Sequence, residues 1–568
     1  MNSKDLPLSE YPYPSFKRDS YLSLNGKWDY KIIKDLTLSK EFNKQIIVPY
    51  AIESSASEVN IRLDSTDHIL YHRKVVLDKD FIKDFVFLHF EGIDQISYIY
   101  INNILVYKHI GGYNPFKVEI SDYIKNNRFD LKVIVVDEEE NSQFSRGKQV
   151  RNNSRIFYKS TTGIYKPVWI ESTHNEFIKE AIFTGDFDKK AVKILIKTST
   201  DGDVFIKIDK QKCCIKSNVE TLIKLDEFKE WNPDSPYLYR CQVAYKNDII
   251  ESYFGVRKIE TRKDKFNTPR IYLNNKPYFI TGLLDQGYYN KGELTPFNYK
   301  DYYKDLSLIK KLGFNAVRVH IKLELDQFYF LCDSLGLLVI QDFINGGGPY
   351  NIKRFGVLPT IFGRSYHPKD NRYKFYCRDD SFAREQFIIE SKNIIDTLYN
   401  HPSVIMYTIF NEGWGQFDAN TNYKVFKDYD KSRLYDATSG WIDQGLSDVN
   451  SYHNYFFRHR NHKDLNRPYF ISECGGYSLF NKEHFNGKNV FGYKKFNDVN
   501  DLNKRIEKLY LKEILPLIKK GLSGIIYTQY HDWEDEVNGI VTFDRKEIKI
   551  KQEMMKEINK ALLNELKR

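Results

Sequence analysis

The sequence has few of the residues that build disulfide frameworks or metal clusters. It contains 6 cysteines among 568 residues, and the adjacent Cys213 and Cys214 are too close to pair normally. No C-x-x-C spacing occurs. These absences exclude a disulfide-stabilised scaffold and give a structural zinc site little support. The cysteine content is typical of a protein from a reducing compartment.

Long apolar runs and an excess of one charge are also missing. No segment approaches the roughly 18 apolar residues that span a bilayer, and the polar stretch 1–22 lacks the apolar region of a signal peptide. The 86 basic and 76 acidic side chains leave a net charge of +10 with interleaved signs. The densest basic stretch, 545–551, contains Glu547 and is typical of a solvated helix face rather than a nucleic-acid patch. We therefore expect a soluble, cytoplasmic protein that binds neither membranes nor nucleic acid.

Hydrophobic residues make up 41% of the chain and aromatic residues 15%, which excludes a disordered protein. In residues 1–172, short apolar or alternating runs recur between turn residues such as Asn25-Gly26 and Gly111-Gly112. This pattern predicts a β jelly-roll sandwich. Residues 173–262 repeat the pattern over a shorter length and predict a small immunoglobulin-like β-sandwich.

The pattern changes at about residue 263, where apolar strands begin to alternate with helical periods. Helices are expected at 299–312, 382–399 and 547–566, and a long loop rich in glycine, proline and aromatic residues is expected at 345–380. Eight strand-then-helix units in about 300 residues predict a (β/α)8 TIM barrel over residues 263–568.

Two strands of this predicted barrel end in a glutamate that glycine soon follows. Residues 404–410 lead into Asn411-Glu412-Gly413, and residues 468–472 lead into Glu473-Cys474-Gly475. The active sites of such barrels lie at the carboxyl ends of the strands, and a buried carboxylate is costly unless it is paired. The two glutamates therefore suggest an acid/base pair of the kind that hydrolyses glycosidic bonds. Other strands add polar side chains to this ring: Arg318, His320, His453 and Tyr455.

Structural explanations compete with this reading. A single glutamate at a strand end more often forms a cap or an ion pair than catalyses a reaction, but two such ends with Asn411 before one of them favour catalysis. Gly413-x-Gly415 is not a dinucleotide-binding loop, because Asp418 stands where a third glycine is required. The chain has no phosphate-binding P-loop and no G-x-S-x-G nucleophile elbow.

The chain resembles glycoside hydrolase family 2, which contains β-galactosidases, β-glucuronidases and β-mannosidases, over nearly its whole length. The resemblance is carried by the order and spacing of several motifs: Leu24-Asn-Gly-Lys-Trp28, Tyr71-His-Arg73, Gly111-Gly-Tyr-Asn-Pro-Phe116, Thr161-Thr-Gly-Ile-Tyr-Lys-Pro-Val-Trp169, Trp231-Asn-Pro-Asp-Ser-Pro-Tyr-Leu-Tyr239, Gly313-Phe-Asn-Ala-Val-Arg-Val-His320, Asn411-Glu-Gly413 and Ser472-Glu473.

The resemblance implies a retaining mechanism in which Glu412 is the general acid/base and Glu473 the nucleophile. By the same resemblance, Asn411 binds the sugar 2-hydroxyl and Arg318 supports the nucleophile. Tyr455 matches a tyrosine near the nucleophile, and His320 and His453 line the sugar pocket. No organic cofactor is implied. Some galactosidases of the family use Mg²⁺ or Na⁺, but the sequence offers no clear metal ligand set.

Departures from the family patterns bear on the choice of sugar. The glucuronidases of the family resemble one another in an Asn-x-Lys that grips the substrate carboxylate, and here Glu536-Val537-Asn538 stands in its place. An anionic Glu536 would repel a uronate. The aromatic residue often found at the end of the eighth strand is also missing, and Trp533 is a candidate substitute. Asp285 either contacts a sugar hydroxyl or caps the next segment, and Trp414 either stacks on the sugar or packs at the barrel top.

We therefore expect a retaining, exo-acting β-glycosidase that removes a terminal β-linked sugar and most resembles a β-galactosidase. The alternatives are a β-mannosidase, a β-glucuronidase or an α-arabinopyranosidase, and a non-catalytic carbohydrate-binding protein. The expected partner is a carbohydrate substrate, and the sequence leaves a homo-oligomer open.

Overall fold

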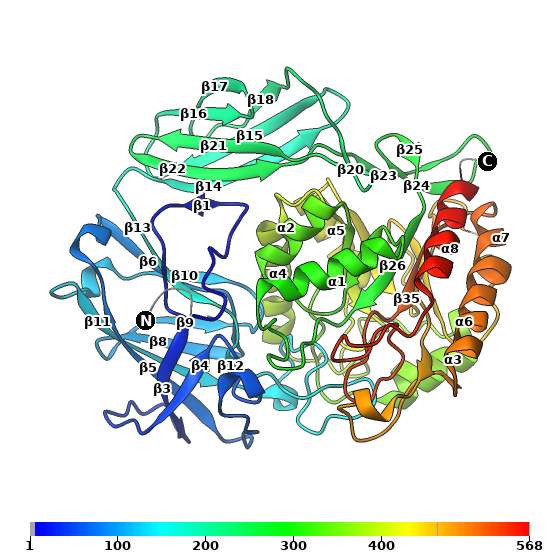
Figure 1. Cartoon of the computed structure of the whole chain (residues 1–568), viewed down its shortest axis with the longest axis horizontal. Coiled ribbons are helices and arrows are strands. Elements are labelled where there is room, and N and C mark those ends of the chain that lie inside the picture. Colours follow the sequence, from blue (N-terminus) through cyan, green and yellow to red (C-terminus); the bar gives the residue numbers. More distant parts are fainter. Residues whose placement is uncertain (1–5, 463, 567–568) are drawn as a thin grey trace.

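The protein is built from two β-sandwiches and a barrel (Figure 1). The structure, a computed structural model, describes residues 6–462 and 464–566. The first five residues of the predicted jelly-roll domain and the last two of the predicted barrel domain therefore lie outside the described residues. In Figure 1 the first sandwich lies beside the barrel, and the second extends over both.

The first sandwich packs a six-stranded sheet against a four-stranded sheet. Its strands alternate buried and exposed residues; in β3, for example, Trp28 and Tyr30 point into the core while Lys27 and Lys31 face solvent. The six-stranded sheet has the order β4 (Lys44–Val48), β3 (Gly26–Ile33), β5 (His68–Val76), β11 (Arg128–Val136), β8 (Ile96–Ile101) and β9 (Ile104–Ile110). The four-stranded sheet has the order β10 (Phe116–Glu119), β6 (Phe85–Phe90), β13 (Val168–Thr173) and β2 (Leu22–Ser23).

The second sandwich includes a strand from the start of the chain. Its five-stranded sheet has the order β1 (Lys17–Arg18), β22 (Asp248–Phe254), β21 (Tyr239–Tyr245), β16 (Asp203–Ile208) and β17 (Gln211–Lys216). Its three-stranded sheet has the order β14 (Ile178–Asp186), β15 (Ala191–Thr198) and β18 (Thr221–Lys224). Arg18, on β1, is buried and pairs with Asp248 of this sandwich and Glu171 of the first. The ion pairs join the two sandwiches.

The barrel is confirmed as eight parallel strands. They follow the order β30 (Leu434–Ser439), β29 (Val404–Asn411), β28 (Leu338–Asp342), β27 (Ala316–Val319), β26 (Ile280–Asp285), β35 (Leu522–Thr528), β32 (Tyr469–Gly475) and β31 (Asn450–Asn454). The end strands β30 and β31 lie next to each other, so the sheet is nearly closed. Every residue of β29 and β32 is buried, as expected for parallel strands that are covered on both faces.

Helices cover the outside of the barrel, but the prediction of eight regular strand–helix units is wrong. The helices are α1 (Tyr299–Lys311), α2 (Asp326–Leu335), α3 (Leu358–Phe362), α4 (Ser381–Leu398), α5 (Ala419–Tyr429), α6 (Val499–Lys508), α7 (Leu515–Ile518) and α8 (Gln552–Glu565). Among the described residues, none forms a helix between β30 and β31 or between β31 and β32. The first of these connections, 440–449, is too short and glycine-rich for a crossover helix. The expected loop 345–380 contains α3. Within the part of the chain that the structure describes, no helix is long and apolar enough to cross a membrane.

The remaining strands are short and form small two- and three-stranded sheets. They are β7 (Ile93–Asp94), β12 (Gly163–Ile164), β19 (Trp231–Asn232), β20 (Ser235–Pro236), β23 (Ile259–Lys263), β24 (Pro269–Leu273), β25 (Lys276–Pro277), β33 (Tyr477–Leu479) and β34 (Lys494–Phe496).

A long loop of the first sandwich extends onto the mouth of the barrel. The backbone N–H groups of Arg146 and Gly147 donate to the Asn345 carbonyl across 3.1 and 2.9 Å. Gly147 has a φ of +65°, and a Cβ there would lie 2.7 Å from Tyr113 Oη and 2.8 Å from the Ile321 carbonyl. The close fit requires glycine and fixes the residues that follow above the barrel strands.

Candidate active site

The two predicted glutamates lie together at the carboxyl end of the barrel. Glu412 follows β29 directly, and Glu473 is part of β32. One oxygen of each carboxylate and one nitrogen of His453 all lie within 4.8 Å of one another. His453 Nδ1 is 2.8 Å from Glu412 Oε1, and its Nε2 is 3.4 Å from Glu473 Oε1. The imidazole therefore contacts both carboxylates.

The local backbone explains why both side chains point into the same space. Glu412 has a φ of +55°, which is a sparsely populated region for a non-glycine residue, and Gly413 continues the turn at +79°. The Glu412 N–H donates to the Ser439 carbonyl across 3.0 Å, which holds the turn against β30. In β32 the register with β35 shifts between Ile471 and Cys474, and such a bulge re-aims a side chain at a barrel rim.

Arg318 organises the floor of the site. From β27 its Nη1 donates to Glu473 Oε1 across 3.1 Å, and its Nη2 donates to Asn411 Oδ1 across 2.8 Å. Its Nε donates to Asp342 Oδ1 across 2.9 Å. The guanidinium is fully buried and binds three side chains from three strands, which fixes the orientation of each.

These contacts control the charge on Glu473. Burial alone would raise its pKa, but the adjacent His453 imidazole, the Arg318 guanidinium and the His320 imidazole outweigh this effect, and Tyr455 donates a hydrogen bond to Glu473 Oε2. The pKa of Glu473 is consequently lowered to about 2. The carboxylate is anionic at neutral pH, as a nucleophile must be.

Asp342, at the end of β28, is a member of this cluster that the sequence analysis did not select. It accepts from Arg318 and lies 2.8 Å from His320 Nδ1. Burial raises its pKa, but the Arg318 charge and the His320 hydrogen bond lower it overall. The sequence marks Asp342 in the same way as the two glutamates, because an apolar strand ends abruptly in this carboxylate.

Tyr455 follows β31 and stacks on Tyr493, with ring centroids 3.8 Å apart and planes 2° apart. Since its hydroxyl contacts Glu473, this stacking holds a hydrogen-bond donor beside that carboxylate.

Within the described part of the chain, three of the predicted site residues hydrogen-bond neither to the two glutamates nor to Arg318 or Asp342. Asp285 accepts from the Gly287 N–H across 3.0 Å, the local contact expected of a cap. Trp414 is buried, with the Arg146 guanidinium 4.7 Å above its ring. Trp533 is buried and stacks on Tyr288 at 5.2 Å. The tryptophan that borders Glu412 is Trp441, whose Nε1 donates to the Glu412 carbonyl across 3.2 Å. It lies in a loop without periodicity, so no sequence signal pointed to it.

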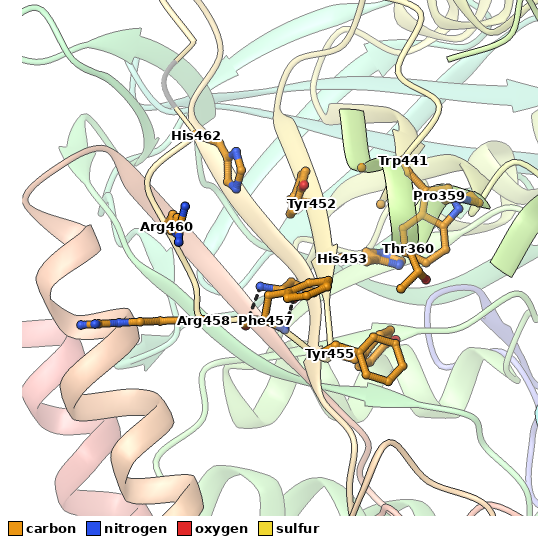
Figure 2. Close-up of a pocket in the computed structure, with 14 residues that line it drawn as sticks. Pro359, Thr360, Trp441, Tyr452, His453, Tyr455, Phe457, Arg458, Arg460 and His462 are labelled. Atoms are coloured by element: carbon orange, nitrogen blue, oxygen red, sulfur yellow. Dashed lines mark hydrogen bonds between the residues drawn. The ribbon is translucent and has the colours of Figure 1, made fainter. Parts of the chain in front are cut away.

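A cavity of about 600 Å³ opens beside Glu412, and a second hollow of about 350 Å³ lies next to it. Thr360, Trp441, Tyr455 and Phe456 line both. Figure 2 shows the second hollow, in which Pro359, Thr360 and Trp441 gather at one end and Arg458, Arg460 and His462 at the other. Glu412 lines the larger cavity with a side chain that is 18% exposed, whereas the Glu473 side chain is 4% exposed and lies deeper.

The loop from the first sandwich forms one wall of the site. The Tyr158 hydroxyl donates to the buried carboxylate of Glu536, and Asn538 Nδ2 donates to the same group across 3.3 Å. Burial raises the pKa of Glu536, and the charge of Lys148 opposes that shift. Among the described residues, no acceptor pairs with Lys148 Nζ, whose contact is with the Tyr158 ring at 5.7 Å.

Two carboxylates and an imidazole can also hold a transition-metal ion. Among the described residues this is the one such group of three acidic, histidine or cysteine side chains. A cation bound there would occupy one oxygen of each carboxylate. The two carboxylates have oxygens within 4.8 Å of each other. In retaining glycosidases the two carboxyl groups lie roughly 5–5.5 Å apart.

A barrel with paired carboxylates at its carboxyl end and two attached sandwiches is the architecture of a class of glycoside hydrolases. Three models of one family match the chain: the sugar-binding domain of glycosyl hydrolases family 2 at residues 22–173, the family 2 central model at 166–257 and the family 2 TIM-barrel domain at 265–519. The chain belongs to glycoside hydrolase family 2.

The relatives carry different substrate names. The chain is 26% identical over 450 residues to a β-galactosidase from Thermoanaerobacter pseudethanolicus, covering 73% of this chain and 55% of that one. It is 24% identical over 466 residues to a β-glucuronidase from Streptococcus agalactiae, covering 74% and 72%. The chain thus spans about half the length of the first relative. The structure of a family 2 β-galacturonidase from Eisenbergiella tayi bound to galacturonate superposes with a TM-score of 0.70 at 19% identity, covering 97% of this chain and 98% of that one.

Proposed function

We propose that the protein is a retaining β-glycosidase that removes a terminal sugar by double displacement. The observation that carries the proposal is the approach of Glu412 and Glu473 to within 4.8 Å, with opposite environments. Glu473 is buried beside the Arg318 guanidinium, whereas Glu412 borders an open cavity. This asymmetry suits a nucleophile on the sugar side and an acid on the leaving-group side.

In the first step Glu412 donates a proton to the glycosidic oxygen while Glu473 attacks the anomeric carbon, which forms a glycosyl ester and releases the alcohol. In the second step Glu412 removes a proton from water, the water attacks the same carbon, and Glu473 leaves as a carboxylate. Arg318 and Tyr455 stabilise the charge on Glu473 before attack and after release. Asn411, which accepts a hydrogen bond from Arg318, is the residue that we propose binds the neighbouring sugar hydroxyl.

We propose that the sugar of the substrate is uncharged, and that a β-galactoside is the first candidate. Glu536 supports this choice, because its carboxylate is an acceptor for hydroxyls and would repel a uronate when ionised. β-Mannosides and α-arabinopyranosides are neutral alternatives.

A β-glucuronide is the second candidate, and Lys148 favours it. Its ammonium group has no acceptor among the described residues, lies near enough to oppose the pKa shift of Glu536, and could bind a substrate carboxylate. The β-glucuronidase relative gives this candidate similar support.

The test is p-nitrophenol release from five glycosides: β-galactoside, β-glucuronide, β-mannoside, β-glucoside and α-arabinopyranoside. We expect turnover of the β-galactoside, lost in Glu473→Ala and Glu412→Ala and retained in Glu385→Ala, which removes an exposed glutamate of α4. Preferred turnover of the glucuronide, abolished by Lys148→Ala, would replace the first choice of sugar with the second. Activity that survives Glu473→Ala would overturn the mechanism. Binding of sugars without turnover of any glycoside would favour the carbohydrate-binding alternative.

A further inference from the structure

The cavity beside Glu412 is unusually apolar at its rim. Ile361 is 66% exposed, Phe456 57% and Ile352 48%, and all three line this cavity together with Phe157 and Trp441. Exposed large apolar side chains that gather in one concave place mark a binding surface, whereas scattered ones need no explanation. These residues come from the sandwich loop, the α3 segment and the segments after β30 and β31, so the rim is assembled from distant parts of the chain.

The place of Glu412 in this cavity identifies the occupant. The general acid of a retaining glycosidase protonates the oxygen of the leaving group, so the aglycone lies on the acid's side of the sugar. Glu412 lines the cavity, while Glu473 does not. The space that receives the aglycone is therefore bordered by apolar side chains.

We propose that the enzyme acts on glycosides whose aglycone is a large apolar group, which the rim formed by Phe157, Ile352, Ile361, Trp441 and Phe456 binds. The inference rests on the proposed glycosidase function and names its substrate class. A volume of about 600 Å³ accommodates a group far larger than methyl and falls within the range of pockets for drug-sized ligands. The second hollow, with Arg458 and Arg460, offers a competing site for a polar or anionic aglycone.

The test uses a series of alkyl β-glycosides (methyl, butyl and octyl) of the sugar that the enzyme accepts. The alcohols have similar leaving-group acidity, so differences in kcat/KM report burial of the alkyl chain. We expect kcat/KM to rise roughly twofold to fourfold per methylene over the first few carbons and then to level off. Phe456→Ala should lower the octyl-to-methyl ratio of kcat/KM about tenfold, and Ile361→Ser should lower it in the same direction.

Phe457→Ala is the matched control. Phe457 is the next residue in the same segment and is also exposed, but it lines the second hollow and not the larger cavity. Its ratio should equal that of the wild type. An equal loss in Phe457→Ala, or a preference for anionic over alkyl aglycones, would place the aglycone in the second hollow and overturn the inference.

Binding of 2-naphthol, measured by calorimetry, separates failure of this inference from failure of the proposed function. Turnover of glycosides with no dependence on chain length and no naphthol binding would overturn the inference alone. Naphthol binding that Phe456→Ala weakens, without turnover of any glycoside, would overturn the glycosidase function and with it the assignment of the cavity to an aglycone.

Discussion

Arg318 Nη1 lies 3.1 Å from Glu473 Oε1, and both side chains are almost fully buried. The same guanidinium binds Asp342 and Asn411. One arginine thus fixes the position of the proposed nucleophile, its charge, and the residue proposed to bind the neighbouring sugar hydroxyl.

Replacement of Arg318 should change the pH dependence of the enzyme. Its positive charge helps to lower the pKa of Glu473 to about 2, so its removal raises that pKa. Glu473 reacts only when ionised, so in Arg318→Met the acid limb of kcat/KM should move to higher pH. We also expect a loss of roughly 10²–10³-fold at neutral pH. Arg262→Lys, on the distant β23, is the control, and an unshifted acid limb in Arg318→Met would contradict the role of this contact.

The Tyr455 hydroxyl should contribute to kcat more than to KM. Tyr455→Phe removes the hydrogen bond to Glu473 and keeps the ring that stacks on Tyr493. A hydrogen bond to a charged group contributes about 1.5–3 kcal/mol, so kcat should fall roughly 10- to 100-fold. Tyr429→Phe, which loses a surface hydrogen bond to Asp396, should retain wild-type kinetics. A rise in KM at constant kcat would instead indicate a role in ground-state binding.

The sequence predicted the parts of the site that carry a local signal. Glu412 and Glu473 were found because each ends an apolar strand, where an unpaired carboxylate is costly. Asp342 carried the same signal and was not selected. Trp441 and Phe456 lie in connections without periodicity, and the sandwich loop reaches the barrel through contacts between residues far apart in the chain. Local sequence patterns carry no information about such contacts. The two missing barrel helices have a similar cause, since strand–helix alternation was extended over connections too irregular to form helices.

The turn at Gly413 should tolerate no side chain. Gly413 has a φ of +79°, and an added Cβ would overlap Ile442 Cδ1. Gly445 has a φ of +101° but has nothing within 4 Å of the Cβ position, which makes Gly445→Ala a matched control for backbone strain alone. Strain costs about 1–3 kcal/mol at either position, and Gly413→Ala should lose more stability and also misplace Glu412. Thermal unfolding and kcat/KM check this prediction, and equal behaviour of the two variants would contradict it.

A buried histidine should stabilise the junction of the domains. His401 Nδ1 lies 2.7 Å from Asp333 and Nε2 lies 3.0 Å from Asp326, while Tyr253 of the second sandwich also donates to Asp333. Burial would lower the pKa of His401, but the two aspartates raise it to about 10. Because the folded pKa exceeds the unfolded value of about 6.5, this stabilisation is complete below that pH and is lost as the pH rises through 10.

His401→Gln should therefore destabilise the protein by roughly 3–5 kcal/mol at pH 6. The gap in melting temperature between wild type and variant should narrow towards pH 10. The half-exposed His174, which lies 3.4 Å from Asp84, provides the control His174→Gln. A gap that stays constant from pH 6 to pH 10 would show that His401 is neutral in the folded protein.

The central claim is that Glu473 forms a covalent bond with the sugar. It is tested most directly by incubating the protein with a 2-deoxy-2-fluoro-β-galactosyl fluoride, or with the corresponding derivative of the sugar it prefers, and mapping the labelled peptide by mass spectrometry. The account predicts one added fluorosugar on Glu473 and none in Glu473→Ala. A label on another residue, or rapid turnover of the glycosyl fluoride with inversion and no label, would contradict it.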